Sequence, residues 1–377
     1  MGPDEQQAFP FKALDIAHVL ANDPPSVDWL IRERIELGRG SLISGLGGSS
    51  KTRMLYHLGI GSCIGRLPWG WEVVKQGKAV LLLNEDRCAD AHRIIHGMCI
   101  ALDLNEDDRA LLMASLNVFP LAGESVRLLM FDEKTRMLVE NGFAKRLSEE
   151  VNRLGNVVFV GLDPALSLTP GDENDQSHQR ALGKLVDDLA INTGASVVLV
   201  AHAAKAIQGR EDIESHSSRG GGAITDAVRC EMVMRAMTPK EAKALGIADQ
   251  TERRRHVQLA ITKANSCPPE SFTPVWLRRG EFGALAGAEL AQQVAEGEAS
   301  LKAGDLKILN LLREMCADRV PKLEVWRAAA IERKFIQENL SKESQVQAMK
   351  RSISRLMNAG EIKAGIARGT YVPSNEE

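Results

Sequence analysis

The segment from Ser41 to Thr52 constrains the fold more than any other part of the chain. It reads SLISGLGGSSKT, a short apolar strand that runs into a glycine-rich turn and then into a helix. The phosphate-binding template G-x-x-x-x-G-K-[ST] needs inward-facing backbone N–H groups, a lysine ammonium on the β- and γ-phosphates and a hydroxyl on Mg²⁺. The turn supplies all three, so the sequence predicts that it binds ATP with Mg²⁺. The predicted nucleotide-binding residues are Gly45, Gly47, Gly48, Ser49, Ser50, Lys51 and Thr52.

Ser50 stands where the template has its second glycine. A serine still offers its N–H, but its Cβ restricts φ and limits how closely the backbone approaches a nucleotide. The loop is therefore either a tolerated variant or a weakened one. An ordinary glycine turn before a helix is the alternative interpretation, but the strand and helix on either side favour a phosphate loop.

Composition sets broad limits on the function. The 377 residues suffice for one large domain and a smaller one, at about 100–200 residues per domain. With 44% hydrophobic and 26% charged residues, the chain is typical of a soluble globular protein, and a net charge of −3 indicates no overall basic field. From residue 301 onward, 14 Lys and Arg stand against 10 Asp and Glu, a net of +4. The C-terminal part is therefore one candidate for contact with DNA.

Cysteine usage and hydropathy indicate the compartment. The six cysteines form no C-x-x-C pair and have no histidine at zinc-finger spacing, which predicts reduced, structural thiols in a cytoplasmic protein. No stretch approaches the roughly 18 apolar residues of a membrane span, and the N-terminus has no basic-then-apolar signal. We therefore expect no contact with membranes.

Four apolar runs have the length and composition of buried strands. Segments with helical spacing lie between them, and the apolar residues of Gln176–Asn192 form one stripe. Continuous apolar strands that alternate with helices indicate a parallel sheet covered on both faces. The predicted fold class is α/β, with a P-loop nucleotide-binding core. The four runs are Ser41–Ser44, Ala79–Leu83, Val157–Leu162 and Ser196–Ala201.

The chain divides by composition into three parts. Residues 1–285 form the predicted core, with a short N-terminal extension at 1–28 and a mixed, charged stretch at 104–150 that is expected to be an insertion between core strands. Within this stretch we expect a strand at Asn117–Leu121 and a hairpin near Leu128–Phe131. Residues 286–303 are rich in Ala, Glu and Gln and predict a helical linker. In residues 304–377, three helix candidates precede two short strands around a basic turn, which describes a winged-helix-like domain. A helical assembly domain is the alternative for a domain so near neutral.

Acidic residues follow two of the predicted strands. ATP hydrolysis needs a metal, a residue that orients the attacking water and positive charge on the γ-phosphate. The strand ending at Asp163 has the Walker B form, so Asp163 and the Thr52 hydroxyl are the predicted Mg²⁺ residues. Glu85 follows the second strand, at the ligand crevice of a doubly wound sheet, and is the candidate for polarising the water, with Asp86 as its rival. The structural alternatives are an N-cap or turn for Asp163 and a solvated loop for the other two.

His202 follows the strand Ser196–Ala201. A polar group there is suited to hydrogen-bond the γ-phosphate, and a structural histidine is the alternative. The polar segment Ile207–Ser218 comes next and leads into Arg219 and three glycines. Such a segment either faces a ligand inside a ring or is disordered.

The order of these parts resembles the RecA-like ATPases of the plasmid RepA type, hexameric replicative helicases among the DnaB-related, AAA-family ATPases. The resemblance covers about residues 14 to 283 and is far more specific than the phosphate loop alone. The segments that carry it are Pro24–Leu30, Gly45–Thr52, Gly77–Asp86, Leu162–Pro164 with Gly171–Asp175, His202 and Arg219–Arg229.

The resemblance implies roles for single residues. Glu85 corresponds to the catalytic glutamate, Asp163 to the Walker B acid and His202 to the polar sensor. Arg229 and Lys263 correspond to the cationic fingers that a neighbouring subunit supplies to the nucleotide. DnaB-like proteins carry an arginine two places after that lysine, whereas this chain has Asn265.

The same resemblance implies a homohexameric ring that grips single-stranded DNA in a central channel. Such channels need only a few positive residues that follow the backbone, so the net charge is no objection. Arg210 and Arg219 are the candidate strand contacts.

Three functions fit the sequence. The first is an ATP-driven, ring-shaped 5′–3′-type helicase or translocase of a plasmid, phage or mobile element, whose winged helix engages DNA or a replication partner. The second is a RecA-like ATPase switch that presents the winged helix to a promoter or origin without unwinding. Ser50 and Asn265 favour the switch, and Glu85 favours a hydrolase. The third, a small-molecule kinase, lacks an accompanying acceptor-site motif.

Overall fold

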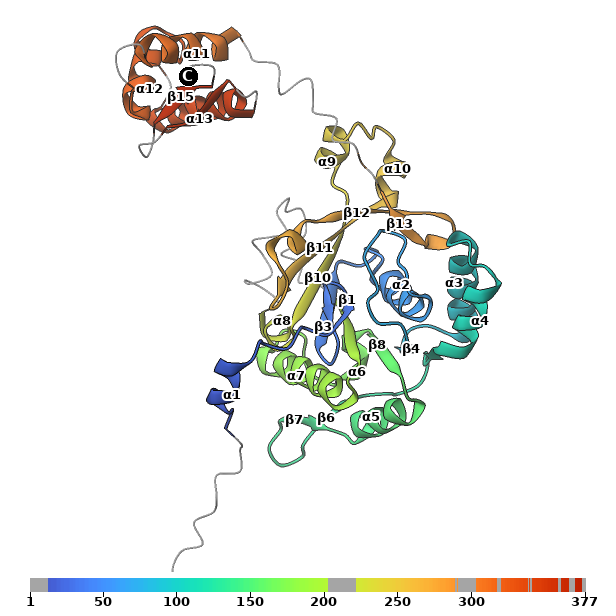
Figure 1. Ribbon diagram of the computed structural model, residues 1–377. Coiled ribbons are helices and arrows are strands. Elements are labelled where there is room, and N and C mark those ends of the chain that lie inside the picture. The colour runs from blue at the N-terminus through green and yellow to red at the C-terminus, as the bar shows by residue number, and fades with distance from the viewer. Residues whose placement is uncertain are drawn as a thin grey trace, which may run out of the picture. The chain divides into compact units, whose positions relative to one another are not determined.

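The chain forms two compact units, residues 1–238 with 249–289 and residues 239–248 with 290–377, each of which is described by itself (Figure 1). Within the part of the chain that is described, no helix combines the length and the apolar character needed to cross a bilayer. The structure is a computed structural model. It describes residues 13–202, 222–288, 290, 303–316, 320–337, 339, 341–358, 361–365 and 370–374.

The larger unit is built on one central sheet, to which the described residues contribute nine strands in the order β13-β12-β11-β10-β3-β9-β8-β4-β5. Neighbours from β10 to β5 are parallel, and those from β10 to β13 are antiparallel. The strands are β3 (Gly40–Gly45), β4 (Lys78–Leu83), β5 (Leu116–Pro120), β8 (Val157–Asp163), β9 (Ser196–His202), β10 (Cys230–Ala236), β11 (His256–Ala264), β12 (Val275–Arg279) and β13 (Leu285–Gly287).

Helices cover both faces of this sheet. Because successive side chains of a strand point to opposite faces, Leu81 of β4 packs into one core with Met54 and Leu58, whereas Leu82 packs into the other with Leu182. Two-sided burial explains the continuous apolar strand sequences. A mostly parallel sheet flanked by helices confirms the predicted α/β class with a RecA-like core. Helices α2 (Lys51–Ile64), α3 (Cys88–Ala101) and α4 (Glu106–Ser115) contribute to the first core, and α5 (Phe143–Leu154), α6 (Ala165–Leu168), α7 (Gln176–Thr193) and α8 (Gly222–Ala227) to the second.

Two boundaries differ from those expected. Residues 104–150 are not simply an insertion, because β5 pairs in parallel with β4 as a member of the central sheet. Its residues are mostly half-buried at the sheet edge, so β5 lacks the apolar run that marks the inner strands. The sheet also continues past residue 285, since β13 ends at Gly287. Residues 291–302 of the predicted helical linker lie outside the described residues.

Smaller elements complete this unit. The antiparallel pair β6 and β7 is the hairpin expected near residues 128–131. These elements are α1 (Ile16–Ala21), β1 (Trp29–Ile31), β2 (Ile35–Glu36), β6 (Leu129–Phe131), β7 (Leu138–Glu140), α10 (Gln250–Arg255) and the 3₁₀ turns η3 (Pro269–Phe272) and η4 (Glu281–Gly283).

The smaller unit has its own apolar core, in which the buried Trp326 donates from Nε1 to the Ile308 carbonyl at 3.1 Å. A buried carboxylate, Asp305, accepts from Arg355 at 2.7 Å and from the Ser352 hydroxyl at 2.6 Å. Three helices followed by an antiparallel strand pair is the element order that the sequence predicts. The elements are α9 (Pro239–Ala244), α11 (Ala303–Cys316), α12 (Leu323–Glu332), α13 (Lys342–Asn358), β14 (Ile362–Ala364) and β15 (Tyr371–Pro373).

Candidate nucleotide-binding site

The predicted phosphate loop joins the carboxyl end of β3 to the first residue of α2. β3 is buried throughout and ends at Gly45, where a Cβ would lie 2.3 Å from the Met234 carbonyl oxygen, so only glycine fits. At Gly47 and Gly48 a Cβ would meet no atom within 4 Å, and Gly48 has a left-handed φ of 74°. The outer side of the loop is therefore open, as the approach of a phosphate chain requires.

Ser50 is the residue immediately before α2 and has φ 73° and ψ 23°, in the left-handed region. Glycine adopts this conformation freely, whereas it costs a residue with a Cβ about 1–2 kcal/mol. The Ser50 side chain makes no capping hydrogen bond that offsets this strain. The loop thus ends at a residue in a strained backbone conformation.

The Lys51 side chain folds back over the loop. Its ammonium donates to the Gly45 carbonyl at 2.9 Å and to the Leu46 carbonyl at 3.0 Å. Burial lowers the Lys51 pKa, while the negative charges of Asp163 and Glu85 oppose that shift. Among the described residues Lys51 forms no ion pair, and its hydrogen bonds go to carbonyls, so its charge remains available to an anion.

The predicted metal residues meet across two elements. The Thr52 side chain, in the first turn of α2, acts on the Asp163 carboxylate at the end of β8 and lowers its pKa. Burial outweighs this effect and raises the Asp163 pKa to about 6. A hydroxyl and a carboxylate are the hard oxygen ligands that Mg²⁺ prefers. The described residues contain no group of three or more His, Cys, Asp or Glu side chains that could hold a metal ion.

The two acids after β4 lie at the same edge. Leu83, the last residue of β4, is opposite Asp163 in the register of β4 with β8. Asp86 is partly buried and accepts from the Tyr56 hydroxyl at 3.0 Å, and burial raises its pKa. Glu85 is exposed, yet its charge acts on both Lys51 and Asp163. Glu85 therefore has the freedom to face a nucleotide, whereas Asp86 is held by its partner.

His202, the last residue of β9, also lies at this edge of the sheet. It is exposed and pairs in register with Gly45, because β9 lies between β3 and β8. The structure thus brings together the phosphate loop, Asp163, Glu85 and His202 at the carboxyl ends of four parallel strands.

The predicted fingers lie at the opposite edge of the sheet. The Arg229 amide donates to the Gly40 carbonyl at 2.9 Å. Gly40 is the first residue of β3, so it lies five residues, or roughly 16 Å of strand, from Gly45 at the start of the nucleotide loop. The Lys263 ammonium donates to the carbonyls of Thr225, Asp226 and Val228, at 2.6, 3.0 and 2.8 Å, around the end of α8. Arg229 and Lys263 therefore do not reach the nucleotide loop of their own chain. Arg210 and Arg219 lie outside the described residues.

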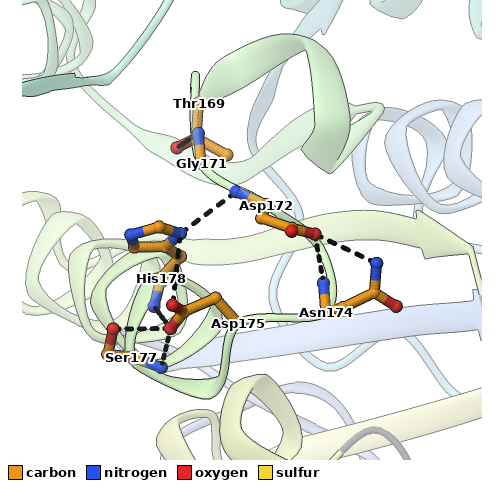
Figure 2. Close-up of polar contacts among 7 residues, drawn as sticks. All are labelled: Thr169, Gly171, Asp172, Asn174, Asp175, Ser177 and His178. Atoms are coloured by element: carbon orange, nitrogen blue, oxygen red, sulfur yellow. Dashed lines mark hydrogen bonds and ion pairs between the residues drawn. The ribbon is translucent and has the colours of Figure 1, made fainter.

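Other acids near the site have structural partners. After β8, Asp172 accepts from the Asn174 amide at 2.8 Å, and Asp175 caps α7 by accepting from Ser177 and His178 (Figure 2). His178 in turn accepts at Nδ1 from the Asp172 amide at 3.1 Å, as Figure 2 also shows. These carboxylates shape the loop that follows the Walker B strand.

Sequence reasoning missed two arginines beside the loop. Arg279, the last residue of β12, donates from Nη2 to the Gly48 carbonyl. Arg53, the residue after Thr52, has a buried Nη1 with no hydrogen-bond partner among the described residues. The pair Arg278-Arg279 is visible in the sequence, but the pattern does not tell which of the two faces the site.

Arg53 also borders a pocket of about 350 Å³ beside the first turn of α2. Phe282 has a left-handed φ of 56° and packs against Gly97 of α3. A Cβ on residue 97 would lie only 2.2 Å from the Phe282 Cβ, so this contact requires glycine. The pocket lining is Arg53, Asp90, Arg93, Ile94, Phe282 and Gly283.

Comparison with known proteins gives one family. Residues 5–208 match the family model described as AAA domain. No match was found among curated proteins. Among solved structures, the crystal structure of the RadB recombinase is similar over 68% of this chain and 93% of that chain, with 13% sequence identity and a TM-score of 0.41.

Proposed function

The chain belongs to the AAA domain family, which marks it as a nucleoside triphosphate hydrolase, and on that premise we propose a DNA helicase. The proposed enzyme is an ATP-driven helicase or translocase of a plasmid, phage or mobile element. It acts as a ring-shaped homohexamer on single-stranded DNA during replication. Its location is the cytoplasm.

The observation that carries the proposal is the meeting of Lys51, Asp163 and Glu85 at one sheet edge. ATP binding draws the Lys51 ammonium from the Gly45 and Leu46 carbonyls to the β- and γ-phosphates, where its charge offsets that of the transition state. Thr52 and Asp163 would hold Mg²⁺, which would supply positive charge against the phosphates. Glu85 orients the attacking water, and His202 hydrogen-bonds the γ-phosphate.

The nucleoside occupies the pocket beside α2. Its volume of about 350 Å³ suits a purine base, and Arg53 joins it to the phosphate loop. The Phe282 ring and the Arg93 guanidinium offer flat surfaces on which a base can stack. Asp90 fixes Arg93 with a 2.5 Å hydrogen bond.

The ring supplies the remaining charge. Arg229 and Lys263 stand at the sheet edge away from the nucleotide loop of their own chain, as residues acting on a neighbouring subunit would. The Lys263 ammonium donates three hydrogen bonds to carbonyls around the end of α8. The buried Arg229 Nε, by contrast, has no hydrogen-bond partner in the described part of the chain. Arg229 is therefore the stronger of the two finger candidates.

DNA is bound at two places in this proposal. Arg210 and Arg219 contact the single strand inside the ring. The C-terminal unit is a winged helix, and the exposed Lys350 and Arg351 on α13 contact duplex DNA or a replication partner.

An ATP-gated regulator that does not unwind DNA is the second candidate. The left-handed Ser50 favours it, because a strained phosphate loop suits slow turnover. A strand-displacement assay on a forked duplex separates the two functions. The helicase releases the labelled strand only with ATP and Mg²⁺, and Lys51→Ala abolishes release. ATP hydrolysis with no displacement on forks of either polarity would favour the regulator.

A further inference from the structure

The turn between β12 and β13 lies against the nucleotide loop and is fixed at several points. Arg279, at its start, contacts the Gly48 carbonyl through Nη2 and the Arg254 carbonyl through Nη1 at 3.3 Å. At the other end, the Cβ position of Gly283 is 3.3 Å from Arg53 Nε. Between them, Phe282 packs on α3 at Gly97. Arg279 is thus held beside the phosphate loop by a turn with little room to move.

The surroundings of Arg279 lack a counter-charge. In the described ranges no carboxylate forms an ion pair with Arg279, and its buried Nε has no hydrogen-bond partner. Arg278, the preceding residue, instead forms a bidentate pair with Glu252 at 2.6 and 3.0 Å. Burial lowers the Arg279 pKa, but a guanidinium stays charged throughout the physiological range.

A half-buried cation without a carboxylate is unfavourable unless an anion completes its environment. The neighbouring loop has the sequence and the open outer face of a phosphate site. We infer that Arg279 is a further phosphate-binding residue, whose guanidinium exchanges the Gly48 carbonyl for phosphate oxygens of a nucleoside triphosphate bound to the same subunit. This inference rests on the proposed nucleotide site, and it adds a cation from the same chain to those expected from a neighbour.

The alternative is that Arg279 only clamps the loop to β12. Arg279→Gln tests this, because glutamine keeps N–H donors for a carbonyl but has no charge. Arg279→Ala removes both, and Arg279→Lys keeps a cation. Arg278→Ala is the matched control, since it removes the neighbouring arginine that is paired with Glu252. Calorimetry on the full chain measures the Kd for Mg-ATP and for inorganic tripolyphosphate, which has no nucleoside.

We expect Arg279→Ala and Arg279→Gln to weaken both ligands by about 10- to 100-fold, the range for a charged hydrogen bond. Arg279→Lys should recover part of the loss, and Arg278→Ala should change neither Kd. Wild-type affinity in Arg279→Gln would overturn the inference in favour of a clamp. A loss for ATP without a loss for tripolyphosphate would overturn it in favour of a nucleoside contact. If the wild-type chain binds neither ligand, the proposed function fails as well, so the two failures are distinguishable.

Discussion

The Lys51 ammonium lies 2.9 Å from the Gly45 carbonyl oxygen, six residues earlier in the same loop. The lysine that is expected to bind phosphate therefore also ties the two ends of the loop together.

Replacing Lys51 with alanine should lower ATP hydrolysis by about 100-fold or more, because the substitution removes the cation aimed at the transferring phosphate. The fold should persist, since the lost bonds join neighbouring loop residues. Steady-state ATPase rates and circular dichroism measure both effects. Lys184→Ala, which removes an exposed lysine paired with Asp188 on α7, is the control. Near-normal turnover in Lys51→Ala would show that the loop does not bind ATP as described.

Glu85→Gln should bind ATP normally but hydrolyse it about 100- to 1000-fold more slowly, since a general base or water-orienting group is lost. Asp86→Asn should keep most activity, because Asp86 is occupied by the Tyr56 hydroxyl. Single-turnover hydrolysis and nucleotide binding, measured on both variants, separate chemistry from affinity. If Asp86→Asn alone loses turnover, the two acids have exchanged roles.

These chemical groups were predictable because each one follows an apolar run, and the ends of parallel strands meet at one edge. The hydrogen-bond partners of Arg279 and Lys263 could not be predicted, because these contacts join segments far apart in the sequence. The strand β5 was expected, but within an insertion and not in the central sheet, because an edge strand has no need of a continuous apolar pattern. For Ser50, the sequence predicted only that the Cβ restricts φ. It does not show whether the backbone at Ser50 is left-handed, because a loop can also avoid that conformation by changing its course.

Ser50→Gly should stabilise the fold. Relief of the left-handed strain gains about 1–2 kcal/mol, and the added freedom of the unfolded chain offsets roughly half of it, so we expect a net gain of about 0.5–1 kcal/mol. Urea unfolding measures the change. Ser49→Gly, at the preceding residue, whose φ is not left-handed, is a suitable comparison. A lower free energy of unfolding in Ser50→Gly would mean that the serine side chain stabilises the loop.

His57 makes stability depend on pH. It is buried in α2, its Nε2 accepts from the Leu285 amide at 2.7 Å, and burial lowers its pKa to about 3. In the unfolded chain the His57 pKa is about 6.5, so the unfolded state takes up the proton first. The contribution is fully present above about pH 6.5 and is lost as the pH falls toward about 3.

Urea unfolding at pH 7.5 and pH 5 tests this dependence. Relative to wild type, His57→Gln should lose about 2 kcal/mol less stability between the two pH values, because glutamine keeps an acceptor for Leu285 but does not titrate. The difference between the proteins cancels the groups that they share. An identical pH dependence in both would refute the role of His57.

The double variant Lys350→Ala and Arg351→Ala should weaken binding of duplex DNA while leaving the basal ATPase rate unchanged. Each lost phosphate contact should reduce the slope of log Kd against log salt by about 1. Fluorescence anisotropy at several salt concentrations measures this slope. Unchanged affinity and slope would assign the C-terminal unit to protein contacts.

The most direct test of the central claim is the steady-state ATPase rate with and without single-stranded DNA, on protein whose mass is recorded in the same buffer. The helicase account predicts a hexameric mass and a rate that rises strongly with the DNA. A slow rate that is indifferent to DNA, whatever the mass, would contradict it and favour the ATP-gated regulator.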